Sequence, residues 1–168
     1  MTQQAEAGAP TTPRPLTDPV DLQIARALLA DGRSTLKTLS ELTGLSVSAV
    51  QARVRRLETE GVIRGYSALV DAEAIGLPLA ALIAITPLDP AQPDDAPDQL
   101  AGLSEIEACH SVAGDDAYVL FVRVESPTAL EALIREIRKR ANVSTRTTVV
   151  LQTFFERPAA PRGFGPEN

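Results

Sequence analysis

The chain has 168 residues and a net charge of −6, from 22 acidic and 16 basic side chains. This length is enough for one or two small domains with modest cores. A single cysteine excludes an internal disulfide, and there is no run of about 18 apolar residues that could span a membrane. We therefore expect a cytoplasmic protein that has no membrane partner.

The negative charge is concentrated in the second half of the chain. Residues 1–71 carry eight basic and eight acidic side chains, whereas residues 72–168 carry eight basic and fourteen acidic ones. Nucleic acid responds to the local potential, within a Debye length of about 8 Å at physiological salt. The asymmetry therefore predicts two domains with different partners, of which only the first is suited to DNA.

Residues 16–63 have the pattern of a helix-turn-helix domain. Apolar residues recur at helical spacing in three segments, at residues 19–30, 36–43 and 47–60. Thr17 or Asp18 can cap the first helix and Ser46 the third, while Gly44 suits the left-handed position after the second. A helix-turn-helix places its recognition helix in the major groove of DNA, so this domain is predicted to bind DNA.

The third predicted helix has a polar face opposite its apolar stripe. Residues near the start of such a helix can reach base edges, and later ones meet phosphates. We therefore expect Ser48 and Gln51 to bond bases or nearby phosphates. The arginines are expected to contact the DNA backbone, although an arginine can also bond guanine. The candidate DNA-binding residues are Ser46, Ser48, Gln51, Arg53, Arg55 and Arg56. An arginine-rich helix is also compatible with an ordinary solvated surface.

The second half has a different periodicity. We predict a linker strand at 64–78, acting as a wing or a connector, and then a domain at 79–156. Strand patterns occur at 80–85, 105–113, 118–124 and 143–155, and helical ones near 98–103 and 127–140. The order βαββαβ predicts a ferredoxin-like sheet with both helices on one face.

The predicted fold class is therefore α+β, with an N-terminal winged helix-turn-helix domain followed by a ferredoxin-like βαββαβ domain. Residues 1–15 and 157–168 are predicted to be disordered tails, since they offer little that could pack into a core. In the strand at 118–124, Val119 and Phe121 point away from the face that the two helices would cover. This second face is too apolar for water, so we expect a homodimer.

The loop that joins the second and third predicted strands is a candidate ligand site. Gly114 suits a turn, and the adjacent Asp115 and Asp116 could hold an ammonium group. An ordinary hairpin explains the same residues. No catalytic residues, metal site or cofactor are predicted, because His110 is the only histidine and the aspartate pairs lack a nucleophile or metal-binding partners.

The chain resembles the Lrp/AsnC family, the feast/famine transcription regulators of bacteria and archaea. The resemblance runs from about residue 16 to residue 155. In the first half it is carried by DGRSTLKTLSELTGLSVSAVQARVRRLETEGVIRGYSALVD, and in the second by EIEACHSVAGDDAYVLFVRV and NVSTRTTVVL. The segment ITPLDPAQPDDAP is similar to an actinobacterial subgroup.

This resemblance implies a regulator that binds double-stranded promoter DNA and senses an amino acid or related small effector. It implies a homodimer that assembles further, to a tetramer or octamer, with effectors bound between dimers. The effector residues would be Gly114, Asp115, Asp116 and Tyr118 of the loop, with Thr145 and Thr147 on the last strand. Many family members have an acidic residue directly before the loop tyrosine, where this chain has Ala117.

Two alternatives belong to other functional classes. One is an architectural DNA-binding protein that responds to no effector. The other is an enzyme, because sirohaem decarboxylases are similar to this family and retain both domains. Such chemistry would be expected to use histidines for proton transfer, and His110 stands alone.

Overall fold

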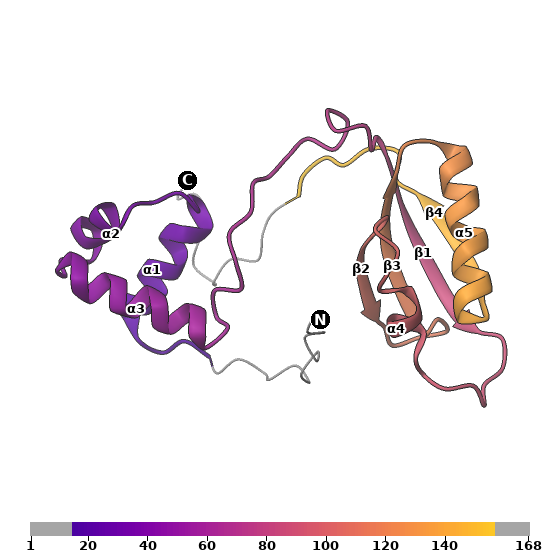
Figure 1. Ribbon diagram of the computed structural model, residues 1–168, viewed down its shortest axis with the longest axis horizontal. Helices are drawn as coiled ribbons and strands as arrows, with labels where there is room; N and C mark the ends of the chain where they lie inside the picture. The colour runs from indigo at the N-terminus through magenta and orange to yellow at the C-terminus, as the bar shows by residue number, and fades with distance from the viewer. Residues whose placement is uncertain (1–14, 157–168) are drawn as a thin grey trace, which may run out of the picture. The chain divides into compact units, whose positions relative to one another are not determined.

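The computed structural model describes residues 15–156, which form two compact units that meet in sequence at residues 68 and 69 (Figure 1). The division falls inside the predicted linker. The two predicted tails lie outside the described residues, apart from Pro15.

The first unit consists of three helices that match the predicted segments. They are α1 (Pro19–Ala30), α2 (Leu36–Thr43) and α3 (Val47–Thr59). Each begins at a side-chain cap, because Asp18 accepts from the Val20 amide at 2.8 Å, Thr35 from Thr38 and Ser46 from Ala49. Gly44 ends α2 with a φ of 71°, which confirms its predicted left-handed conformation.

The core of this unit is built from one stripe of each helix. Ile24 of α1, Leu39 of α2 and Val50 and Leu57 of α3 are almost completely buried. Apolar burial is the main stabilising contribution in so small a unit. These four side chains hold α3 against the other two helices and leave its opposite face in solvent.

The predicted linker strand at 64–78 is wrong. Residues 64–78 contain turns and irregular backbone but no strand, and Leu69 is 96% exposed. A strand is stabilised by a paired neighbour and a packed face, and this segment has neither within the described residues. A turn closes instead at residues 72–77, where the Leu77 amide donates to the Ala72 carbonyl.

The second unit is a four-stranded antiparallel sheet with two helices. Its strands are β1 (Leu79–Pro87), β2 (Ile106–Ser111), β3 (Tyr118–Val124) and β4 (Val143–Val149), and its helices are α4 (Ala96–Leu100) and α5 (Pro127–Ala141). The spatial order β2-β3-β1-β4, with every pair antiparallel, confirms the ferredoxin-like βαββαβ prediction.

The two largest differences from the predicted element boundaries have identifiable reasons. The last strand was expected to reach residue 155, but β4 ends at Val149 because its partner β1 begins at Leu79, which leaves few residues to pair with. The short helix was expected near 98–103 but covers Ala96–Leu100, since Pro97 occupies its first turn.

Helices cover one face of the sheet and leave the other face open. Alternate residues of β1 and β3, such as Ile83 and Leu120, are completely buried against α4 and α5. On the other face Leu82 is 41% exposed, while Arg123 lies over the Phe121 ring and pairs with Glu107 at 3.0 Å. Both helices therefore cover one face only, as the sequence predicts.

Replacing Leu57 with alanine should destabilise the helical unit by about 2–5 kcal/mol, because it leaves a cavity beneath α3. The measurement is urea unfolding followed by circular dichroism. Leu29→Ala on α1 is the matched control. Because Leu29 is 46% exposed, its replacement should lower the free energy of unfolding by roughly 1 kcal/mol or less. Equal losses of unfolding free energy in the two variants would contradict the burial of Leu57 in the core.

Candidate functional sites

The solvent-facing side of α3 begins with polar residues. Ser48 and Gln51 are exposed, and the Ser48 hydroxyl lies 3.1 Å from that of Ser46. Ser46 is engaged by the helix itself, because its hydroxyl accepts from the Ala49 amide at 3.3 Å. The first turns of α3 therefore present hydrogen-bonding groups that the core does not use.

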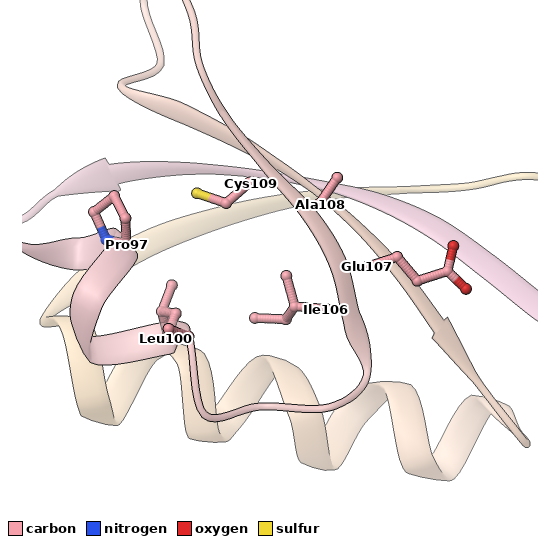
Figure 2. A pocket seen from close by; sticks show the side chains of 7 residues that line it. Pro97, Leu100, Ile106, Glu107, Ala108 and Cys109 are labelled. Carbon is pink, nitrogen blue, oxygen red and sulfur yellow. The ribbon is translucent and has the colours of Figure 1, made fainter. Parts of the chain in front are cut away.

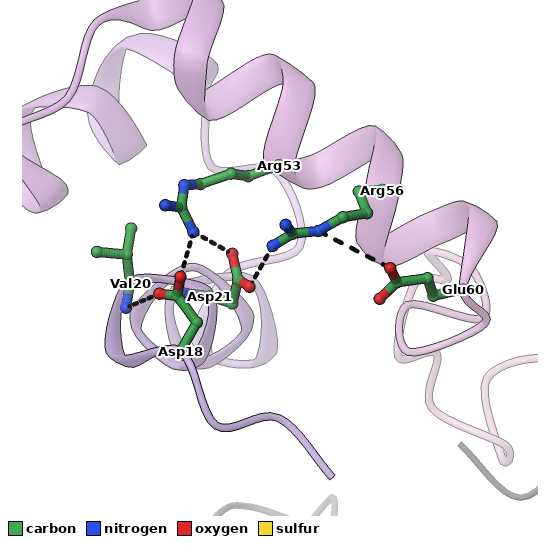
Figure 3. Close-up of polar contacts among 6 residues, drawn as sticks. All are labelled: Asp18, Val20, Asp21, Arg53, Arg56 and Glu60. Atoms are coloured by element: carbon green, nitrogen blue, oxygen red, sulfur yellow. Dashed lines mark hydrogen bonds and ion pairs between the residues drawn. The ribbon is translucent and has the colours of Figure 1, made fainter. Parts of the chain in front are cut away.

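Two arginines of α3 are paired with α1, as Figure 3 shows. The Arg53 Nη1 donates to Asp18 Oδ2 at 2.9 Å and to Asp21 Oδ1 at 2.8 Å. Arg56 forms an ion pair with Asp21 Oδ2, and its Nε lies 3.9 Å from Glu60. The sequence prediction assigned both arginines to the DNA backbone, whereas the structure directs them to α1.

The pairing shifts the pKa values of Asp18 and Arg53. The hydrogen bond from Arg53 holds the pKa of the Asp18 carboxyl below its usual value. The hydrogen bonds to Asp18 and Asp21 in turn raise the pKa of Arg53. Arg55, between the two paired arginines in sequence, is exposed and has no ion pair with any residue from 15 to 156. It is the arginine of α3 that is most available to an external anion.

The predicted effector residues lie on two faces of the sheet. Asp116, just before β3, accepts from the Thr86 hydroxyl at 3.4 Å and forms an ion pair with Arg146 of β4. Arg146 is opposite Ala84 in the β1–β4 register, on the face that the helices leave open. Asp115 is exposed beside Gly114, whose φ is 146°.

Tyr118, Thr145 and Thr147 belong to the face that the helices cover. Both Tyr118 and Thr145 are opposite Ile85, and Tyr118 is only 8% exposed. The Thr145 hydroxyl accepts from the Arg138 Nε of α5 at 2.7 Å. Within one chain, these three residues are therefore separated from Asp116 by the sheet.

The Tyr118 hydroxyl donates to Asp94 of the loop between β1 and α4. This hydrogen bond to a carboxylate, together with burial, raises the pKa of Tyr118 to about 12. Sequence reasoning missed Asp94, Thr86 and Arg146 as partners of the loop. The strand register could have indicated Thr86 and Arg146, which lie on β1 and β4, whereas Asp94 lies in a loop that no register places.

A hollow of about 160 Å³ lies between β2 and α4 (Figure 2). It is lined by Pro97, Leu100, Ala101, Ile106, Glu107, Ala108 and Cys109. Burial raises the pKa of the Cys109 thiol, which makes it a weak nucleophile at neutral pH. Among the described residues, no cluster of His, Cys, Asp and Glu could hold a metal ion, and no helix is long and apolar enough to cross a bilayer.

Both units match known families. Residues 17–64 match a winged helix-turn-helix DNA-binding domain, and residues 80–160 match the Lrp/AsnC ligand-binding domain. The transcriptional regulator LrpA of Mycobacterium tuberculosis is 57% identical over 138 residues, which are 82% of this chain and 92% of LrpA. The chain belongs to the Lrp/AsnC family. It is a transcriptional regulator with a DNA-binding helix-turn-helix domain and a ligand-binding domain.

Other members of the Lrp/AsnC family agree with this assignment. The leucine-responsive regulatory protein of Escherichia coli K12 is 36% identical over 140 residues, which are 80% of this chain and 85% of that protein. A feast or famine regulatory protein from M. tuberculosis, solved in complex with L-methionine, is 56% identical. It superposes with a TM-score of 0.83 over 86% of this chain and 99% of its own.

Tyr118 should keep its proton until pH about 12, because its hydrogen bond to Asp94 favours the neutral phenol. The unfolded-state pKa is near 10. The bond therefore stabilises the fold below pH about 10, and this contribution is lost as the pH rises toward 12. The measurement is the ultraviolet absorbance of tyrosinate in a Tyr66→Phe background, where Tyr118 is the one remaining tyrosine.

Asp94→Asn should bring the titration midpoint of Tyr118 down toward the ordinary value near 10, because the charged acceptor is removed. Asp95→Asn is the matched control, since Asp95 bonds Gln99 and acts on Tyr118 only weakly through its charge. A wild-type midpoint already near 10 would show that the bond to Asp94 is absent in solution.

Proposed function

We propose that the chain is a cytoplasmic, non-enzymatic regulator that binds promoter DNA as a homo-oligomer and responds to an amino acid. The observation that carries this proposal is the 57% identity to LrpA across both units. A role in binding rather than catalysis agrees with the regulator names of the relatives and with the exposed position of His110 on β2.

In this proposal the exposed side of α3 enters the major groove. Ser48 and Gln51 bond base edges or nearby phosphates, and Ser46 orients the start of the helix as its cap. Arg55 contacts phosphate or guanine, because its guanidinium is exposed and has no ion pair with the described residues. Arg53 and Arg56 contribute less than the sequence suggests, since α1 already engages them.

The proposed effector is an amino acid, with methionine as the first to test because a 56% identical relative was solved with L-methionine. A free amino acid carries both an ammonium and a carboxylate. Asp116 and Arg146 offer the complementary pair of charges. In their ion pair the Arg146 side chain is 74% exposed and that of Asp116 is 20% exposed, so the arginine can turn toward an effector carboxylate and leave Asp116 to the ammonium.

Oligomerisation would complete this site. The open face of the sheet, with Leu82, Val119 and Phe121, supports a second copy as its cover. The predicted residues Tyr118, Thr145 and Thr147 are separated from Asp116 within one chain, so they would reach one ligand only if different subunits supplied them. A dimer also agrees with a helix-turn-helix that binds paired half-sites of DNA. The proposal includes further assembly of the dimers to a tetramer or octamer.

Arg55→Ala should weaken binding to duplex DNA and reduce the slope of log K against log salt concentration by about 1, as expected for the loss of one phosphate contact. Fluorescence anisotropy with a labelled duplex, at several salt concentrations, measures both. Arg33→Ala is the matched control, because it removes the same charge from an exposed loop outside α3. An unchanged slope for Arg55→Ala would contradict the assignment of α3 to DNA.

Asp116→Asn should abolish the rise in melting temperature that the effector produces, since the ammonium loses its charged partner. Differential scanning fluorimetry with each of the amino acids, methionine first, measures this rise. Asp98→Asn is the matched control for charge, because Asp98 is exposed on α4 and is not among the predicted effector residues. If the effector still raises the melting temperature of Asp116→Asn, the effector site lies elsewhere. Light scattering tests the oligomer separately, and a monomeric wild-type chain would contradict it.

A further inference from the structure

Asp21 is the one charged side chain among residues 15–156 that is buried, with 3% of the residue exposed. Its two carboxylate oxygens are divided between two arginines of α3. Oδ1 accepts from Arg53 at 2.8 Å, and Oδ2 is paired with Arg56 (Figure 3). The carboxylate therefore bridges two guanidinium groups that lie one turn apart on the helix proposed to enter DNA.

This arrangement opposes the departure of either arginine. A buried carboxylate that loses its partner becomes an unpaired charge without water, which is strongly unfavourable. Arg53 is held most firmly, because its Nη1 also donates to Asp18 at 2.9 Å and its side chain is only 28% exposed. Arg56 is 49% exposed and has Glu60 as a second, more distant partner.

The carboxylates also offset the charge of the two arginines. Asp18, Asp21 and Glu60 all face Arg53 or Arg56, so three negative groups surround two positive ones. Binding to DNA of any sequence grows with the number of phosphates that a protein neutralises. Two arginines kept in this cluster are two cations that do not add to sequence-independent binding.

We propose that Asp21 withholds Arg53 and Arg56 from DNA phosphates and so limits non-specific binding by the recognition helix. Asp21 is a positioning residue for specificity, since it touches no DNA and acts through the two arginines. Contact with DNA is left to Ser48, Gln51 and Arg55, whose side chains are exposed on α3. The inference rests on the proposed function of α3.

The decisive variant is Asp21→Asn, tested as full-length protein by fluorescence anisotropy with a labelled duplex of random sequence. Release of one or two arginines to phosphates should tighten binding and steepen the slope of log K against log salt concentration by about 1–2. Asp31→Asn is the matched control, because it changes the net charge equally at an exposed position that contacts neither arginine. A loss of affinity in folded Asp21→Asn, or a slope equal to that of Asp31→Asn, would overturn the proposal.

The double variant Asp21→Asn with Arg53→Gln tests the mechanism, because it should remove at least part of the added slope. A slope that stays as steep as in Asp21→Asn alone, both with Arg53→Gln and with Arg56→Gln, would refute the release of these arginines. The single variant Arg55→Ala must also reduce the slope of log K against log salt concentration. If it does not, α3 is not the DNA-binding face, and the proposed function fails together with this inference.

Circular dichroism melting decides whether Asp21→Asn is folded. If it is not, Arg56→Gln in the wild-type background takes its place, since Asp21 then keeps Arg53 as its charged partner. An Arg56 that is withheld from phosphates adds nothing to the slope, so an unchanged slope in Arg56→Gln supports the proposal. A loss of about 1, as expected for Arg55→Ala, overturns it.

Discussion

The DNA-binding unit depends on one interaction, the bridge from the buried Asp21 carboxylate to Arg53 and Arg56. Four fully buried side chains hold the three helices together, but apolar contacts alone permit small rotations of one helix against another. A bridge between ions demands a specific geometry, because a buried carboxylate must keep both partners. Together with the four buried side chains, it determines which side of α3 faces α1 and which side faces solvent.

In the ligand-binding unit the equivalent constraint is the alternation of the sheet. Residues that point to α4 and α5 make the core, and every second residue is turned the other way. The loop before β3 departs from this rule, because Asp116 lies outside the strand. Tyr118 belongs to the covered face, while Asp116, two residues earlier, meets Thr86 and Arg146 on the open one. Two predicted effector residues that are close in sequence thus have different surroundings.

Local patterns predicted most of the fold because local physics determines it. The bounds of α1 and α2 and the span of β3 agree with the sequence prediction, since caps, a left-handed glycine and period-two alternation are readable in short windows. The linker strand and the end of β4 were wrong because pairing depends on a partner strand elsewhere in the chain. The partners of Arg53 and Asp116 were missed for the same reason, as they lie 32 and 30 residues away.

The sequence prediction assigned all three arginines of α3 to the DNA backbone, and the structure separates them by what surrounds each one. Arg53 and Arg55 have the same chemistry and lie two residues apart, yet Arg53 is engaged by two carboxylates and Arg55 by none of the described residues. A count of basic residues on a recognition helix therefore overstates the charge that DNA meets. Among the arginines of α3, the charge that is left after such pairing lies at Arg55, and this is the charge that DNA meets under the proposed function.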